Sequence, residues 1–155
     1  MKGIPALTIE DVAALDAILA EFIKKAEGDL TVVIDRGGNV ISQFGDQKIV
    51  DVTIIAALAA GSFAATCELA RRIGEVEFNA LFHQGNGSHI LMNSVDDETI
   101  MITVFGKRTT VGLVRFYAGQ AGQSLANLLK SLRGKEHVFE LSATDVSKAP
   151  AFVEH

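Results

Sequence analysis

Tryptophan is absent from the sequence, and cysteine occurs once, as Cys67, in 155 residues. A single cysteine excludes a disulfide within the chain and is typical of a protein from a reducing compartment. Without tryptophan, aliphatic side chains and nine phenylalanines must build the hydrophobic core. A chain of this length most simply forms one domain with a core of its own.

Positive charge and long apolar runs are also scarce. The formal net charge is −5 and no basic run exceeds two residues, whereas a protein that binds nucleic acid needs a basic face. The longest apolar run, residues 54–65, is about half as long as a membrane span. Acidic residues interrupt the apolar positions near the N-terminus, unlike those of a signal peptide. We therefore expect a soluble, cytoplasmic protein that neither binds nucleic acid nor inserts into a membrane.

Three segments carry the periodicity of helices. In the first, Thr8 is a suitable N-cap, and apolar residues recur at helical spacing over residues 9–23. The second segment covers residues 51–74. The third ends at Arg133, but its start stays open within residues 110–118, because β-branched and aromatic residues there favour a strand.

Five shorter runs have the composition of strands, with β-branched and aromatic residues between turn residues. The first two are joined by a short turn and predict a hairpin, and the last three follow one another with short joins. The predicted strands are residues 30–35, 39–45, 76–83, 88–95 and 99–106.

The predicted order of elements is α-ββ-α-βββ-α. This order predicts an α+β fold, with one five-stranded, mainly antiparallel sheet and helices on both faces. We assign residues 1–133 to this domain. Residues 134–155 contain apolar side chains without clear periodicity, and we interpret them as a C-terminal tail that is either docked or binds a partner.

The second predicted helix has two apolar faces of different size. One face is bulky and suited to packing on the sheet: Ile55, Leu58, Ala65, Leu69 and Ile73. The other face has small side chains, which let another backbone approach closely, and two charged residues continue it: Ala57, Ala60, Gly61, Ala64, Glu68 and Arg71. The small face indicates either tight packing within the domain or a contact between helices, in a dimer or with a partner.

The stretch HQGNGSH, residues 83–89, combines residue types found in metal sites, phosphate loops and turns. His83 and His89 have no Cys, Asp or Glu at a useful spacing for a metal site. A phosphate loop would need backbone amides that open a helix, whereas this stretch joins two predicted strands. Asn-Gly is a strong hairpin signal, so we interpret the stretch as a turn that holds no metal.

No set of residues predicts a catalytic mechanism. FGKRTT, residues 105–110, imitates the end of a nucleotide-binding loop, but Met101 stands where such a loop has glycine. The sequence has no Gly-x-Ser-x-Gly turn, and Cys67 lies within a predicted helix without an assured base. The acidic run 96–98 is interpreted as a solvated turn. We therefore expect an interaction module without a cofactor, and not an enzyme.

Four segments give the chain a resemblance to the roadblock/dynein light chain family, and together they run through roughly residues 28–132. The segments are VVIDRGGNVIS (32–42), LAAGSFAATCELARRIGEVEF (58–78), FHQG (82–85) and RTTVGLVR (108–115). The resemblance implies a profilin-like α/β sandwich whose last helix starts near Thr110. It also implies a homodimer in which the third strands pair and the second helices lie side by side. The candidate interface residues are then Ala57, Ala60, Gly61, Ala64, Glu68, Arg71, Phe82 and His83.

Some bacterial members of this family regulate a Ras-like small GTPase, so the resemblance implies an MglA-type GTPase, in its GTP form, as the partner. It also implies that the dimer stimulates GTP hydrolysis by ordering the catalytic residues of the GTPase, without an arginine finger. The alternative is a roadblock-type adaptor that scaffolds partners without stimulation. A third interpretation is a small-ligand or metal-binding domain that uses the two histidines. The arginines are expected to form ion pairs or to stay solvated: Arg71, Arg72, Arg108 and Arg115.

Overall fold

The computed structural model describes residues 6–48 and 51–147, with side chains described up to residue 134. Five strands form one sheet in the order β2-β1-β5-β4-β3, and every neighbouring pair is antiparallel. Along the chain the elements are α1 (Ile9–Ala26), β1 (Leu30–Asp35), β2 (Val40–Gly45), α2 (Val52–Arg72), β3 (Ala80–Gln84), β4 (His89–Asp96), β5 (Thr99–Phe105) and α3 (Val111–Ser147).

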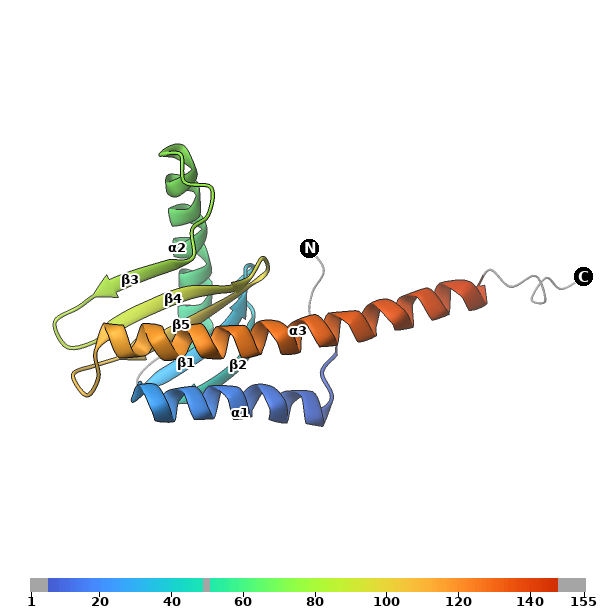
Figure 1. Cartoon of the computed structure of the whole chain (residues 1–155), viewed down its shortest axis with the longest axis horizontal. Helices are drawn as coiled ribbons and strands as arrows, with labels where there is room; N and C mark the ends of the chain where they lie inside the picture. The colour runs from blue at the N-terminus through green and yellow to red at the C-terminus, as the bar shows by residue number, and fades with distance from the viewer. Residues whose placement is uncertain (1–5, 49–50, 148–155) are drawn as a thin grey trace, which may run out of the picture.

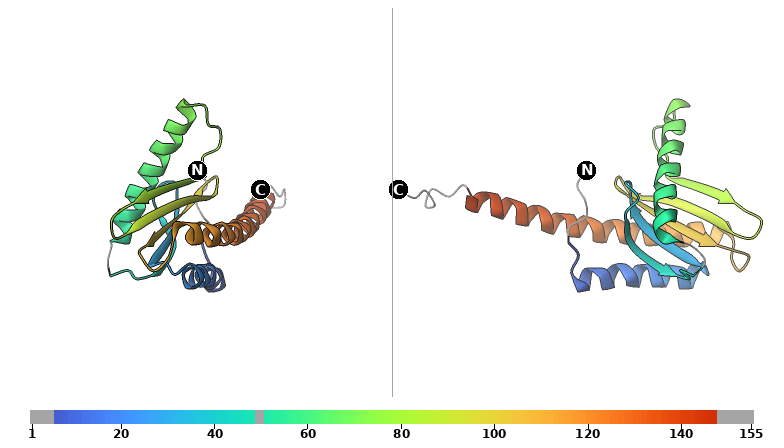
Figure 2. Two further views of the ribbon diagram at one scale, coloured as in Figure 1. Left: turned by 60° about the vertical axis from the view of Figure 1, so that its left-hand side comes forward. Right: turned by 180° about the vertical axis from the view of Figure 1, so that it is seen from behind.

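Helices cover both faces of the sheet (Figure 1). α2 packs on one face, while α1 and α3 lie side by side on the other (Figure 2). The C-terminal half of α2 and the connection to β3 rise past the strands (Figure 1). The predicted fold class, order of elements and antiparallel sheet are confirmed.

Two hydrophobic clusters join these layers. The cluster between the sheet and the α1/α3 pair contains Leu19 and Met101, and the cluster beneath α2 contains Phe63 and Ile102. Successive residues of a strand point to opposite faces, so the neighbours Met101 and Ile102 of β5 serve different clusters. The buried, apolar β5 therefore lies at the centre of the three-layered structure, whereas β2 and β3 form its edges.

α1 begins at a capping box. The Thr8 hydroxyl accepts a hydrogen bond from the Asp11 amide at 3.1 Å, and the Asp11 carboxylate accepts one from the Thr8 amide at 3.0 Å. These two contacts pair backbone amides that a helix start otherwise leaves without partners. Thr8 is thus the N-cap that its sequence position predicted.

α3 begins at Val111, as the family resemblance implied, but it does not end at Arg133. It continues to Ser147 and has 37 residues, which makes it about 55 Å long. Its C-terminal part projects beyond the sheet and α1 (Figure 1). The predicted end was wrong because it relied on apolar periodicity, which a helix needs only where it faces a core. The proposed boundary between residues 133 and 134 therefore falls inside a continuous helix.

Arg133 fastens α3 near the place where the helix leaves the sheet. Its guanidinium donates to the Asp96 carboxylate at 2.6 Å and to the Thr99 hydroxyl at 3.2 Å. Burial raises the pKa of Asp96, but hydrogen bonds from Arg133 and from the Glu98 amide outweigh burial and leave that pKa below its ordinary value. The turn between β4 and β5 thus holds a charged Asp96 against α3.

Candidate interaction surface

The side of α2 that packs on the sheet is neither of the two faces that the sequence separated, and the bulky face predicted to pack there is largely exposed. The buried residues of α2 are Ala56, Ala59, Ala60, Phe63 and Ala70. The strands below already supply large side chains such as Ile34, Met92 and Ile102, so alanines let the helix approach closely. The prediction that the bulky face of α2 packs on the sheet was wrong, because the strands beneath the helix already supply the large side chains of this cluster.

The bulky side of α2 consequently faces solvent and forms an apolar stripe. We define the apolar stripe by its large members with their exposed fractions: Ile54 (56%), Leu58 (66%), Leu69 (62%) and Ile73 (75%). Contiguous exposed apolar surface is unusual on a soluble monomer and marks a place where another molecule binds. A signal in the sequence was available, because a helix that is apolar all round needs cover on more than one side.

A line of small residues runs beside the apolar stripe. Ala57, Gly61 and Ala64 are exposed, and no described atom lies within 4 Å of the position that a Cβ of Gly61 would take. Ala60, predicted to belong to this surface, is instead only 6% exposed and packs in the cluster beneath α2. The exposed small line therefore consists of Ala57, Gly61 and Ala64, without Ala60.

Charged side chains end this surface at the last turns of α2. Glu68 pairs with Arg71 at 2.8 Å and with Arg72 at 3.0 Å, and all three side chains are largely exposed. Pairs of this kind on a helix surface contribute little stability, since water screens them. They can be exchanged at low cost for contacts with a partner. Glu68 and Arg71 thus lie at the surface where the sequence placed them.

β3 is an edge strand, and in the described part of the chain it pairs only with β4. Its outer edge presents backbone N–H and C=O groups that another strand could bind. Phe82 packs toward the α1/α3 side, stacked on Phe105 at 6.1 Å, whereas His83 is exposed. The edge of β3 and the exposed side of α2 are therefore two surfaces without cover.

The Gly-Asn-Gly stretch forms the hairpin between β3 and β4, as predicted. The Gly85 amide donates to Nδ1 of His89 at 3.2 Å, and the His89 ring lies 5.3 Å from that of Phe105. His83 pairs in register with Ile90, and His89 with Gln84, so the two imidazoles point to opposite faces of the sheet. In the described ranges, no three His, Cys, Asp or Glu side chains are grouped as metal ligands would be.

Three of the four arginines singled out in the sequence form ion pairs. Arg71 and Arg72 share Glu68, and Arg108 pairs with Asp29 at 2.9 Å. The fourth, Arg115, has its guanidinium 6.0 Å from the centre of the Phe82 ring. All four arginines are exposed, as at a binding surface, and Arg71 also lines a hollow of about 450 Å³ that contains Cys67.

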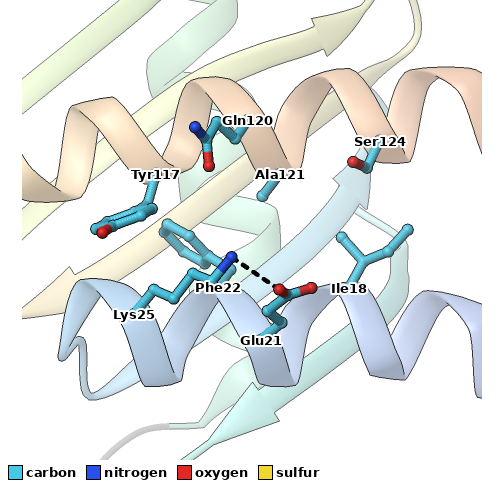
Figure 3. Close-up of a pocket in the computed structure, with 8 residues that line it drawn as sticks. All are labelled: Ile18, Glu21, Phe22, Lys25, Tyr117, Gln120, Ala121 and Ser124. Carbon is cyan, nitrogen blue, oxygen red and sulfur yellow. Dashed lines mark ion pairs between the residues drawn. The ribbon is translucent and has the colours of Figure 1, made fainter.

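A cleft of about 260 Å³ lies between α1 and α3 on the opposite face of the sheet (Figure 3). Phe22 and Ala121 form its apolar floor, and Tyr117 flanks it from α3. Lys25 pairs with Glu21 at 2.8 Å across its rim, and this hydrogen bond lowers the pKa of Glu21 and raises that of Lys25. Ser124 also lines the cleft, and among the described residues no hydrogen bond joins it to Glu21 or Lys25 as a nucleophile would be joined to its base.

α2 is also long and apolar enough to cross a membrane by length and mean hydropathy. The sequence analysis did not predict this, because it considered only the longest uninterrupted apolar run and not the mean hydropathy of the whole helix. Phe63 is fully buried against the sheet, and charged residues occupy the last turns of the helix. α2 is thus a layer of the fold, with one side packed on the sheet and an apolar side that is exposed.

Comparisons with known proteins agree with this architecture. The model of the Roadblock/LC7 domain family matches residues 14–105. Among solved structures, Myxococcus xanthus MglB is 31% identical and aligns over 82% of this chain and 96% of its own, with a TM-score of 0.76. A structure described as MglB with tetrameric arrangement is 22% identical over 85% and 98% of the two chains, with a TM-score of 0.78. No curated protein sequence matches the chain.

A more remote likeness concerns the fold alone. Acanthamoeba castellanii profilin II is 11% identical over 73% of this chain and 97% of its own, with a TM-score of 0.54. The profilin-like sandwich implied by the four sequence segments is therefore confirmed, as is the resemblance to the family.

Proposed function

This chain belongs to the Roadblock/LC7 domain family, and from that premise we propose that it regulates a Ras-like small GTPase as a homodimer without being an enzyme itself. The partner is an MglA-type GTPase in its GTP form, and both proteins act in the cytoplasm. The likeness to MglB at 31% identity supports this partner class. Family folds host more than one function, so the proposal must also rest on the surface of this chain.

The apolar stripe of α2 is the observation that carries the proposal. Leu58 and Ile73 are 66% and 75% exposed, and Ile54 and Leu69 on the same side of the helix are exposed as well. Burying apolar surface contributes about 25 cal/mol for each Å², so a second copy that covers this stripe gains stability from it. The small line formed by Ala57, Gly61 and Ala64 lets a second backbone approach α2 closely.

Two copies joined by α2 and by the edge of β3 form one composite surface. A two-fold axis between the paired elements makes the contact the same for both subunits. The GTPase then binds across both copies of α2, and one dimer binds one GTPase. We assign these residues to the dimer or partner contacts: Ala57, Gly61, Ala64, Glu68, Arg71, Phe82 and His83.

The proposed stimulation works through the GTPase. An arginine finger must reach into the nucleotide site and is worth about 10³-fold or more in rate. Arg71 and Arg72 share Glu68, and Arg108 is held by Asp29, so these side chains already have partners on their own surface. The dimer instead holds the catalytic residues of the GTPase in their reactive arrangement.

The test compares Leu58→Glu in the apolar stripe with Ile9→Glu in α1, where Ile9 is 88% exposed on the other side of the molecule. Both changes place a carboxylate at an exposed apolar position, so neither should unfold the monomer. Sedimentation at micromolar concentration should show a dimer for the unmodified chain and for Ile9→Glu, and a monomer for Leu58→Glu. GTP turnover by the cognate GTPase should be stimulated by the two dimers only.

Two outcomes would change the proposal. If Leu58→Glu stays dimeric and stimulates turnover, the apolar stripe is not the dimer contact. If the unmodified dimer binds the GTPase tightly without raising turnover, the protein is an adaptor that scaffolds its partners.

A further inference from the structure

A second hollow lies on the face of the sheet opposite α2, between α3 and the start of β3. Its volume is about 310 Å³. Most of this hollow lies on the face of the sheet opposite α2, but Asn79 and Ser94 line both it and a neighbouring hollow beside Arg71 of α2. Its lining includes Ala80, Leu91, Asn93, Arg115, Ala118 and Gly119.

Gly119 keeps this hollow open. No described atom lies within 4 Å of the position that its Cβ would occupy, although the residue is inside a helix. Glycine there costs about 1 kcal/mol of helix stability relative to alanine. A Cβ at Gly122, one turn further along, would make an ordinary van der Waals contact, at 3.5 Å, with the Asn93 amide nitrogen. A side chain at the exposed Gly119 would meet only open space at the hollow.

Two polar groups at the hollow lack the partners that their chemistry calls for. The guanidinium of Arg115 rests on the Phe82 ring and forms no ion pair within residues 6–48 and 51–134, unlike Arg71, Arg72 and Arg108. The side-chain oxygen of Asn93 is buried and has no hydrogen-bond partner within the same ranges. Buried polar atoms are usually paired, so an unpaired acceptor beside an open space indicates a place for a donor.

We propose that this hollow is a docking site for a segment of a second protein partner, which inserts an acidic side chain flanked by apolar residues. A carboxylate fits the guanidinium of Arg115, because arginine pairs with carboxylates through two parallel hydrogen bonds. A backbone N–H of the segment donates to the Asn93 oxygen. The flanking apolar side chains lie over the floor of the hollow, where Leu91 and Ala118 are already buried.

This docking site differs from the proposed GTPase surface in its chemistry, although Arg115 rests on Phe82, which we assign to the dimer or partner contacts. Most of the site lies on the opposite face of the sheet, and its ligand is recognised by charge and by fit into a small hollow. A chain with both surfaces can hold a GTPase on α2 and a second, acidic protein beside α3. The same hollow occurs once in each subunit of the proposed homodimer.

The test uses random peptides displayed on phage and selected on the full chain. The enriched peptides should share an aspartate or glutamate next to an apolar residue. One of them is synthesised, and its Kd is measured by fluorescence anisotropy for the unmodified chain and three variants. Arg115→Gln should weaken binding about tenfold or more, the loss expected for a charge-assisted hydrogen bond. Gly119→Leu should fill the hollow and abolish binding.

Lys130→Gln is the matched control, because Lys130 is an exposed cation on the same helix about 22 Å from Arg115. Its Kd should equal that of the unmodified chain. Circular dichroism should show that Gly119→Leu stays folded, since leucine favours a helix more than glycine does.

Several results would overturn this proposal. It fails if no peptide is enriched, if the enriched peptides lack an acidic residue, or if Arg115→Gln and Lys130→Gln bind equally well. It also fails if Arg115→Gln or Gly119→Leu changes sedimentation, because a second copy of this chain then covers the hollow. Absent stimulation of the GTPase, with peptide binding as expected, would contradict only the proposed function.

Discussion

At residue 133 a single guanidinium joins α3 to the turn between β4 and β5. Arg133 and Asp96 have side chains that are 28% and 24% exposed, so water screens their contact less than it screens a surface pair. The pair lies at the end of the part of α3 that contacts the sheet. Loss of this ion pair should therefore weaken the packing of α3 on the sheet and also lower the stability of the whole protein.

We predict that Arg133→Met lowers the free energy of unfolding at pH 7 by about 1–3 kcal/mol, because it leaves a buried carboxylate without its main partner. The pKa of Asp96 lies below its ordinary value, so its stabilising effect is present above about pH 4 and is lost as the pH falls further. The difference between the variant and the unmodified chain should shrink over that acid range. Urea unfolding measured from pH 7 down to pH 3 tests both parts.

Lys25→Met provides the comparison for this measurement. Lys25 also lowers the pKa of an acid, Glu21, but both groups lie on the surface. Replacing Lys25 should hardly change the free energy of unfolding at any pH. If both variants lower the free energy of unfolding equally, the partly buried position of Arg133 does not strengthen its ion pair.

At the scale of elements, α3 combines a packed part with a projecting part. Val114, Ala118, Leu125 and Leu132 are buried in the cluster shared with α1. Beyond Arg133 the helix extends past the sheet (Figure 2). The described core residues of α3 all lie in its first part.

We predict that a chain ending at residue 134 keeps its fold, because it retains every described buried residue and the Arg133 contacts. Its thermal midpoint should lie within a few degrees of that of the full chain, a change of about 1 kcal/mol or less. Differential scanning calorimetry and circular dichroism measure this. Unfolding of the shortened chain would show that residues 135–155 belong to the same folding unit and would contradict the division at residue 134.

α2 illustrates a different relation between an element and its surroundings. Its sheet contact relies on alanines and Phe63, and its exposed side retains large aliphatic residues. A helix that served only this sheet would gain solubility from polar residues on its outer side. The absence of charge before Glu68 therefore reflects a second contact, which the proposed dimer supplies.

At the scale of the whole molecule, the proposed assembly fixes both the ratio of the proteins and the mechanism. We predict one dimer per GTPase in its GTP form, because a site built across a two-fold axis is single. Removing an arginine finger would lower the stimulated rate of GTP hydrolysis roughly 10³-fold. We expect a much smaller change in that rate when alanine replaces any one of four arginines: Arg71, Arg72, Arg108 or Arg115. Mass determination of the complex by light scattering and single-turnover GTP hydrolysis measure the two predictions.

Each arginine variant must first be shown to bind the GTPase normally. A variant that binds but loses nearly all stimulation would identify a finger and exclude the mechanism proposed here. A complex with two GTPases per dimer would place the binding surface away from the two-fold axis.

The sequence determined the order of the elements, the hairpins and the class of fold. These features follow from local chemistry: the capping box at Thr8, the Asn-Gly turn after Gly85, and the β-branched strands. Four short segments also identified the family, which set the start of α3. Local signals of this kind act over a few residues, so they can be read without knowing what lies opposite.

Only the tertiary structure decided which side of α2 is buried and how far α3 continues. Both questions depend on distant residues: Ile102 and its neighbours fill the space beneath α2, so Ala60 is buried and Leu58 is not. α3 runs on past Arg133 and projects beyond the sheet (Figure 1), and apolar spacing did not predict that part of the helix. Whether a residue is buried depends on both of the surfaces that meet there. The sequence of one element does not show which distant residues will pack against it.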